Sequence, residues 1–258
     1  MHPMLNIAIQ ATRQASRTLL RYVDQTDKLD VSEKSTNDFV TQIDKQVEEI
    51  IINDIQKAYP KHAFLAEETK HNTKALDQDF CWIIDPLDGT RNFIHGFPHF
   101  SISIALMMRG QLEVSLVYDP IRQDLFTATR GQGAYLNSRR IRVSPTKKLS
   151  HCLIGTGFPF HDKEKISAYL KTFETVFMNC GDIRRGGSAA LDLAYVASGK
   201  LDGFWEADLD AWDVAAGILL IKEAGGIVTN FHGTDDCLLA GQIVAGNAKI
   251  HKDLLAAL

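Results

Sequence analysis

The chain has 258 residues, of which 45% are hydrophobic and 23% charged; this balance is ordinary for a globular protein and excludes collagen-like, disordered and coiled-coil proteins. Its 28 Lys and Arg and 32 Asp and Glu give a formal net charge of -4, so bulk charge indicates neither nucleic-acid nor membrane binding. Four separated cysteines without a C-x-x-C pair, no signal-peptide pattern and no bilayer-length apolar run favour a cytoplasmic protein with reduced thiols.

Regular spacing of apolar residues predicts two amphipathic helices early in the chain, over 4–23 and 42–58. Pro60 ends the second helix. A short strand signal at 39–41 precedes the start of that helix. A polar stretch at 70–79 is typical of a loop. Turn residues between the strand candidates in residues 100–136 indicate a meander there, and therefore an antiparallel sheet. The predicted strands are 62–66, 80–84, 101–108, 112–118, 124–128 and 133–136.

After about residue 145, predicted strands and helices largely alternate, which indicates an α/β layer. The predicted elements here are strands 151–156, 181–184, 201–206, 226–230 and 242–246, and helices 163–178, 188–198, 211–224 and 248–258. No flexible Gly/Ser linker separates the two patterns. We therefore expect an N-terminal α+β half, 1–145, and a C-terminal α/β half, 146–258, in one compact unit.

The strongest chemical signal is the run Asp85-Pro86-Leu87-Asp88-Gly89-Thr90, which follows an apolar strand. Pro86 stiffens the turn between two carboxylates, and Gly89 permits an unusual dihedral or a close approach. Backbone N–H groups at a helix start after Gly89 suit a phosphate. Carboxylates would repel a phosphate unless hard divalent cations bridge the two. The competing interpretation is a surface turn of common composition, which the preceding apolar strand makes less fitting.

Three further acidic positions belong with this run. Glu67-Glu68 ends another predicted strand, Asp213 begins an apolar helix, and Asp44 lies near the start of the helix over 42–58. Each has an ordinary interpretation of its own. Adjacent glutamates are usually solvated in a loop, and an aspartate in the first helical turn is often only a cap.

Together these segments resemble the inositol monophosphatases, in the Mg²⁺-dependent, lithium-sensitive phosphatase superfamily, and they are most like its bacterial members. The matching stretches, in order along the chain, are Asn37-Asp38-Phe39-Val40-Thr41 through Asp44, Glu67-Glu68, Asp85 through Thr90, Arg185-Gly186-Gly187-Ser188-Ala189-Ala190, Trp212-Asp213-Val214-Ala215-Ala216-Gly217 and Glu223-Ala224-Gly225-Gly226. The resemblance covers essentially the whole chain. It implies a layered α/β/α/β/α sandwich of the inositol monophosphatase and fructose-1,6-bisphosphatase type, with the active site between the two halves.

The resemblance also implies two or three Mg²⁺ ions and a metal-activated water. The implied metal ligands are Glu67, Asp85, the carbonyl of Leu87, Asp88 and Asp213. Thr90 would contact the attacking water and pass a proton on to Asp44 or Glu67. The implied substrate contacts are Asp88, Gly89, Thr90, Gly187, Ser188, Ala189, Glu206 and Asp213.

The leading expectation is a phosphomonoesterase that converts myo-inositol 1-phosphate, or a similar polyol phosphate, to the alcohol and phosphate. Adenosine 3′,5′-bisphosphate, fructose 1,6-bisphosphate and histidinol phosphate remain alternative substrates. A second class is a binding protein, because bacterial members are associated with RNA polymerase in ribosomal RNA antitermination complexes. Arg184-Arg185 and the basic stretch 139–148 would serve such binding, although they equally suit a dimer contact, the fold or a solvated edge strand. The family also implies a homodimer.

Overall fold

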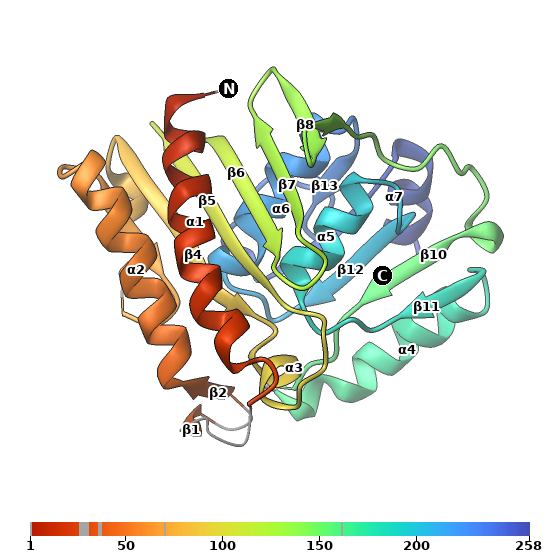
Figure 1. The fold of residues 1–258 in the computed structure, drawn as a ribbon. Helices are drawn as coiled ribbons and strands as arrows, with labels where there is room; N and C mark the ends of the chain where they lie inside the picture. Colours follow the sequence, from red (N-terminus) through yellow and green to blue (C-terminus); the bar gives the residue numbers. More distant parts are fainter. Residues whose placement is uncertain (1, 26–30, 36–37, 70, 161) are drawn as a thin grey trace.

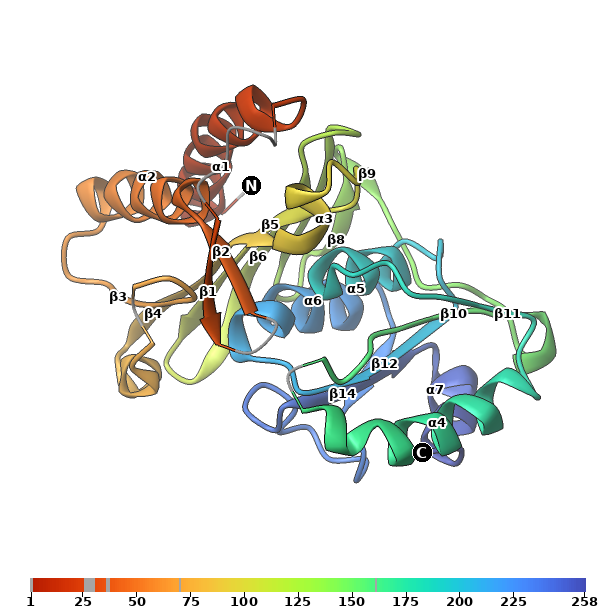
Figure 2. The same ribbon diagram turned by 90° about the horizontal axis from the view of Figure 1, so that it is seen from below.

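The computed structural model describes residues 2–25, 31–35, 38–69, 71–160 and 162–258, and arranges them in five layers (Figures 1 and 2). Helices α1 (Pro3–Tyr22) and α2 (Gln42–Ala58) cover the outer face of a seven-stranded sheet. Helices α5 (Ala189–Ala197) and α6 (Ala211–Glu223) fill the space between this sheet and a five-stranded one. Helices α4 (Ile166–Phe177) and α7 (Ala248–Leu255) cover the far face of the second sheet. The expected α/β/α/β/α sandwich is confirmed.

The larger sheet has the order β3-β4-β5-β6-β7-β8-β9. Its strands are β3 (Ala63–Ala66), β4 (Phe80–Asp88), β5 (Ser101–Met108), β6 (Gln111–Asp119), β7 (Asp124–Thr129), β8 (Gly133–Leu136) and β9 (Arg139–Arg140). The meander predicted for residues 100–136 is confirmed, and the structure extends it: from β4 to β9 each strand pairs antiparallel with the next. Only β3 joins in parallel, at the edge beside β4. The basic stretch 139–148 begins in the exposed edge strand β9.

The smaller sheet is mixed, with the order β11-β10-β12-β14-β13. Its strands are β10 (Leu153–Thr156), β11 (Asp182–Arg184), β12 (Gly203–Ala207), β13 (Ile227–Thr229) and β14 (Gln242–Gly246). Strand β10 is parallel to both neighbours, whereas β14 is antiparallel to both of its own. The two sheets fall on either side of residue 145, and the division of the chain there stays a prediction.

The structure corrects the sequence reading at three places. An antiparallel hairpin of β1 (Val31–Ser35) and β2 (Asp38–Thr41) stands where only 39–41 was predicted, because polar residues hide the strand pattern. The predicted loop over 70–79 contains a 3-10 helix, Thr73–Asp77, and residue 70 lies outside the described part. Strand β4 runs on to Asp88, so the acidic motif is part of the sheet rather than a turn after it.

Helix α6 is the central element of the sandwich. Every residue from Val214 to Ile221 is buried, as expected of a helix with a sheet on each side and a helix beside it. A Cβ built on Gly217 would come within 2.5 Å of Leu193 on α5, so a glycine allows the two helices to touch. This packing holds α6 against α5, and Asp213 lies in the first turn of α6.

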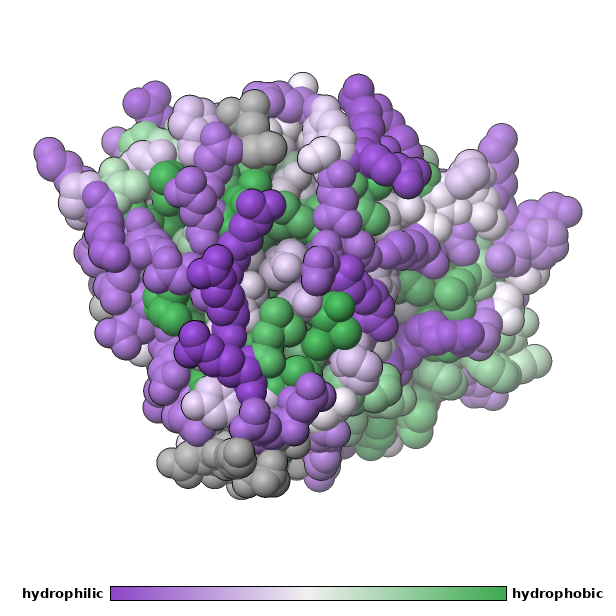
Figure 3. All heavy atoms as spheres, viewed as in Figure 1, coloured by the Kyte–Doolittle hydropathy of each residue, from purple (hydrophilic) through white to green (hydrophobic). Residues whose placement is uncertain are grey.

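Helix α4 keeps part of its apolar face exposed (Figure 3, lower right). Its exposed apolar residues, with the next residue along the chain, are Ile166, Leu170, Phe177 and Met178. Among the described helices, none has both the length and the apolar character that crossing a membrane requires.

Candidate active site

A β-bulge brings the two carboxylates of the Asp85–Asp88 motif to the same place. Asp85 pairs with Ser103 of β5, but Asp88 pairs with Ser101, so β4 contains one extra residue. Side chains three apart on a regular strand point to opposite faces, and one extra residue returns them to the same face. Pro86 fits here because it has no N–H to contribute to the ladder.

Asp213 completes a cluster of three carboxylates. It comes from the first turn of α6, and one ligand atom from each of Asp85, Asp88 and Asp213 lies within 4.8 Å of the others. Asp213 is also a capping residue, since its Oδ2 accepts a hydrogen bond from the backbone N of Asp210 at 2.7 Å. The capping interpretation and the cluster therefore both hold for this residue.

The electrostatics of the cluster favour a cation. Burial, followed by repulsion from neighbouring carboxylates, raises the pKa of Asp85 and of Asp213 well above the ordinary value. Burial likewise raises the pKa of Asp88 to about 6, although hydrogen bonds from Ser188 and Ala190 oppose the shift. An oxygen-only donor set of this charge fits a hard divalent ion such as Mg²⁺.

Glu67 stands beside the cluster and shares a side-chain hydrogen bond with Asp85. It directly follows β3, and its backbone N donates to the carbonyl of Ile84 on β4 at 3.2 Å. Behind it, the buried carboxylate of Glu48 on α2 accepts from the backbone N of Glu68 at 2.7 Å and from the hydroxyl of Thr69. Sequence reasoning missed Glu48, because its contact spans 20 residues of chain.

Thr90 opens the short helix α3 (Thr90–Ile94), directly after Gly89. Gly89 has φ +96°, and a Cβ there would lie 3.1 Å from the carbonyl of His99, so glycine is required. The Thr90 hydroxyl lies 3.0 Å from Oδ1 of Asp44 and 3.0 Å from the carbonyl of Leu87. The helix start thus brings a hydroxyl, a carboxylate and the Leu87 carbonyl together.

Asp44 has two structural partners. Its Oδ2 accepts from the backbone N of Thr41 at 2.9 Å and from the Thr41 hydroxyl, in a capping box at the start of α2. Its other oxygen receives Thr90. Burial raises the pKa of the Asp44 carboxyl, although the hydrogen bonds from Thr41 and Thr90 oppose this. Asn37, from the same motif, lies outside the described residues.

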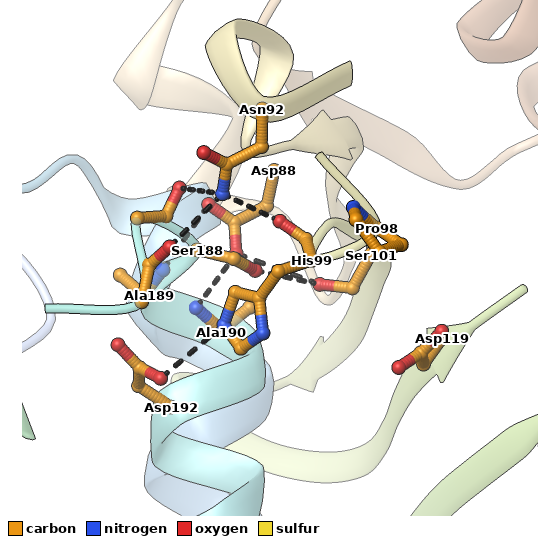
Figure 4. A network of polar contacts seen from close by, with 12 residues as sticks. Asp88, Asn92, Pro98, His99, Ser101, Asp119, Ser188, Ala189, Ala190 and Asp192 are labelled. Carbon is orange, nitrogen blue, oxygen red and sulfur yellow. Dashed lines mark hydrogen bonds and ion pairs between the residues drawn. The ribbon is translucent and has the colours of Figure 1, made fainter. Parts of the chain in front are cut away.

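The carboxylate of Asp88 ties β4 to the start of α5 (Figure 4). The Ser188 hydroxyl and the backbone N of Ala190, at 2.9 Å, donate to Oδ2, and the backbone N of Ala189 donates to Oδ1 at 3.3 Å. Asp88 therefore satisfies N–H groups that have no partner within the helix.

A second tie in the same network comes from Asn92 on α3 (Figure 4). Its amide nitrogen lies 2.6 Å from the carbonyl of His99 and 3.0 Å from that of Gly186. Nε2 of the His99 side chain lies 3.4 Å from Oδ1 of Asp192 on α5. The segment before Ser188 is thereby held against the loop that follows α3.

A cavity of about 170 Å³ opens onto the cluster. Every residue that the resemblance assigned to substrate contact lines it, whereas Asp44, Glu67, Asp85 and Leu87 do not. The sequence-predicted lining residues are Asp88, Gly89, Thr90, Gly187, Ser188, Ala189, Glu206 and Asp213. The lining residues that sequence reasoning did not assign there are Arg91, Phe158, Phe160, Arg185, Ala207, Asp208 and Leu209.

Glu206 follows the buried part of β12 and reaches over Gly157. A Cβ built on Gly157 would lie 1.6 Å from Oε1 of Glu206, so the carboxyl occupies space that any other residue would fill. Burial raises the pKa of Glu206 to about 8, with repulsion from Asp192 adding to the shift and Arg185 opposing it. Glu206 therefore binds a proton at higher pH than an ordinary glutamate, and a protonated carboxyl can both donate and accept hydrogen bonds.

Arg184 and Arg185, which the sequence treats as a pair, separate in the structure. Arg184 forms an ion pair with Asp182 in the same strand, β11, at 2.5 Å. Arg185 lines the cavity, with its guanidinium carbon 4.9 Å from the ring centre of Phe160. Sequence reasoning missed this contact, because nothing in the sequence ties Phe158-Pro159-Phe160 to Arg185.

Comparison with known proteins places these features in context. Residues 1–258 match the model of the inositol monophosphatase family. The Nus factor SuhB of Escherichia coli (strain K12) is 50% identical over 256 residues, which cover 99% of this chain and 96% of that protein. The crystal structure of the extragenic suppressor protein suhB from Bartonella henselae has a TM-score of 0.95 at 44% identity, covering 99% of this chain and 98% of that one. For the inositol monophosphatase from Anabaena (Nostoc) sp. PCC 7120, the TM-score is 0.86 at 38% identity, covering 98% and 94%.

Proposed function

The chain belongs to the inositol monophosphatase family, and from this premise we propose that it is a Mg²⁺-dependent phosphomonoesterase acting on myo-inositol 1-phosphate or a similar polyol phosphate. The observation that carries the proposal is the cluster of Asp85, Asp88 and Asp213 at a cavity lined by hydrogen-bonding groups. Carboxylates this close are stable together only when protons or cations offset their charge. Cations at this cluster would also offset the negative charge of a bound phosphate.

The residues present fit the ions. Two or three Mg²⁺ would be held by Glu67, Asp85, Asp88, Asp213 and the carbonyl of Leu87. Bound there, the ions would lower the pKa of a coordinated water and offset the charge of the phosphate. The phosphate itself would contact the backbone of Gly89 and Thr90.

The protein groups around the phosphate have defined tasks under this proposal. The Thr90 hydroxyl donates toward Asp44, which leaves its oxygen free to accept a hydrogen bond from the attacking water. Asp44 can take up a proton, because burial has raised its pKa. Glu206 would accept and donate hydrogen bonds with polyol hydroxyls, together with Gly187, Ser188 and Ala189.

The test is phosphate release from myo-inositol 1-phosphate with and without Mg²⁺, for the wild type, Asp85→Asn and the exposed control Asp235→Asn. We expect Mg²⁺-dependent turnover that Asp85→Asn abolishes and the control retains. A folded wild type that releases no phosphate from this substrate would contradict the inositol assignment. The substrates to test next would then be bisphosphate nucleotides, fructose 1,6-bisphosphate and histidinol phosphate.

A second candidate function follows from the relatives that are called Nus factor SuhB, one of them 50% identical. By that likeness the chain would bind the RNA polymerase machinery and act in transcription antitermination. The two functions separate in one experiment, in which Asp85→Asn replaces the wild type in an antitermination assay. If the inactive Asp85→Asn variant still supports antitermination, the chain has a role in transcription that does not depend on phosphatase activity. If the folded wild type shows no antitermination, the proposed role in transcription is contradicted.

The homodimer expected from the family is also proposed. The exposed apolar side chains of α4 are the candidate surface for it. Sedimentation of the wild type and of Leu170→Glu tests this directly. A wild-type dimer that Leu170→Glu dissociates supports the assignment, and a wild type that is monomeric at all concentrations contradicts it.

A further inference from the structure

We propose that the active-site cavity contains a second anion subsite, built by Arg185 on the rings of Phe158 and Phe160 with Arg91 nearby. The preferred substrates would then be polyol phosphates that carry a second phosphate group. This inference rests on the proposed function, since it takes the first phosphate to bind at Gly89 and Thr90.

The charges that line the cavity lead to this assignment. Its acidic residues are Asp88, Glu206, Asp208 and Asp213. Asp88 and Asp213 belong to the metal cluster, and Asp208 forms an ion pair with Lys165. Arg91 and Arg185 are the cationic residues that line the cavity. Neither of them has a role in the proposed binding of the metal ions.

The guanidinium of Arg185 is held in place by aromatic rings. Its carbon lies 4.9 Å from the ring centre of Phe160 and 5.7 Å from that of Phe158, and the two rings meet edge to face. Within the described part of the chain Arg185 forms no ion pair at salt-bridge distance, in contrast to Arg184, although its charge acts on Glu206 and on the buried Asp192. A guanidinium stacked on a ring keeps its N–H edge available, and that edge matches two oxygens of a phosphate.

Arg185 also lies close to the predicted substrate contacts. A Cβ built on Gly187 would lie 2.5 Å from Nη1 of Arg185, so this nitrogen sits directly over the Gly187 backbone. Gly187 lines the cavity beside Ser188 and Ala189. A substrate that contacts these residues would present its far substituent to Arg185.

Arg91 extends the positive charge on the same wall. It follows Thr90, and its guanidinium carbon lies 5.2 Å from the ring centre of Phe160, the ring that also supports Arg185. Two cations beside one ring repel each other, and an anion at this wall reduces that repulsion.

Two substrates that differ by one phosphate test the inference: fructose 1-phosphate and fructose 1,6-bisphosphate. We expect the wild type to prefer the bisphosphate by about tenfold or more in kcat/KM, since a charge-assisted hydrogen-bonded pair is of that size. Arg185→Gln should bring the ratio of the two kcat/KM values close to one, and Arg185→Lys should restore part of it. Arg184→Gln, the neighbour outside the cavity, should keep the wild-type ratio.

Each outcome decides one point. Wild-type turnover of both substrates without a preference overturns the subsite and leaves the phosphatase assignment intact. A preference that survives in folded Arg185→Gln overturns the role of Arg185. No turnover of either substrate, nor of myo-inositol 1-phosphate, overturns the proposed function and the subsite with it. Inhibition by fructose 6-phosphate gives an independent measure, since Arg185→Gln should weaken it and Arg184→Gln should not.

Discussion

The hydroxyl of Thr90 lies 3.0 Å from Oδ1 of Asp44, across 46 residues of chain. This contact joins the start of α3 to the start of α2 directly beside the acidic cluster. The same Asp44 carboxylate closes the capping box of α2 through its other oxygen. One side chain therefore fixes a helix end and orients a hydroxyl, so its two roles need separate tests.

Replacing Thr90 by Val keeps the size of the side chain and removes the hydroxyl. We expect kcat to fall by about 10²-fold or more, the scale of a positioned proton-transfer group, while Thr90→Ser stays close to the wild type. Steady-state kinetics at saturating Mg²⁺ measures both variants. A Thr90→Val enzyme with more than half of the wild-type kcat would show that the hydroxyl has no part in the reaction.

The metal-free protein should be more stable with Asn at position 85. Burial and neighbouring carboxylates raise the pKa of Asp85, so near neutral pH the folded chain either retains a proton there or buries a charge. Asn removes that cost, and its amide can donate to Glu67. We expect Asp85→Asn to unfold at a higher temperature than the wild type in chelator.

Mg²⁺ should reverse this order. Ligand at about 100 times its Kd stabilises a folded protein by about 2.7 kcal/mol, and Asp85→Asn lacks a ligand. Thermal unfolding in chelator and in excess Mg²⁺ gives both comparisons, with Asp235→Asn as the surface control. Equal Mg²⁺-induced shifts in the wild type and in Asp85→Asn would contradict the metal assignment of Asp85.

Glu48 should act on the metal site through Glu67. Its carboxylate accepts two hydrogen bonds from the turn after β3, and Gln would direct N–H groups at one of those donors. Loss of such an outer contact typically weakens metal binding by about 10- to 100-fold. We expect Glu48→Gln to raise the Mg²⁺ concentration needed for half-maximal activity, and exposed Glu49→Gln to leave it unchanged. Matching Mg²⁺ curves for the two variants would refute this role.

Glu206 should make the metal-free protein less stable as pH rises. Its pKa is about 8 in the folded chain against an ordinary value of 4.5, so between these values the folded state binds more protons than the unfolded state. The contribution is fully present below pH 4.5 and is lost as pH rises through 8. Urea unfolding in chelator should show a shallower pH slope for Glu206→Gln, and an unchanged slope would contradict the shifted pKa.

The sequence could predict the layers because their patterns are local. Helical spacing marks α1 and α2, and turn residues mark the meander from β5 to β8. The paired carboxylates of Asp85 and Asp88 are also local. The bulge that aligns them is invisible in the sequence, because it depends on pairing with Ser101 and Ser103.

Contacts made over long distances along the chain explain what was missed. Glu48 looks like one more polar helix residue until Glu68 and Thr69 lie against it. Arg185 looks like half of a basic pair until its guanidinium lies against the rings of Phe158 and Phe160, while Arg184 pairs with Asp182. Neither position carries a period, a cap or a turn signal that a single sequence could display.

The carboxylate of Asp88 is bound by groups that lie 100 to 102 residues further along the chain, at the start of α5. Strand β4 and helix α5 must therefore pack together before the Asp88 carboxylate reaches its final position. Under the proposed function, phosphate release would therefore depend on this packing. Two fragments produced by cutting the chain in the loop between β9 and β10 would be inactive separately and active once recombined. Recovery of activity would therefore measure how far the two sheets have assembled.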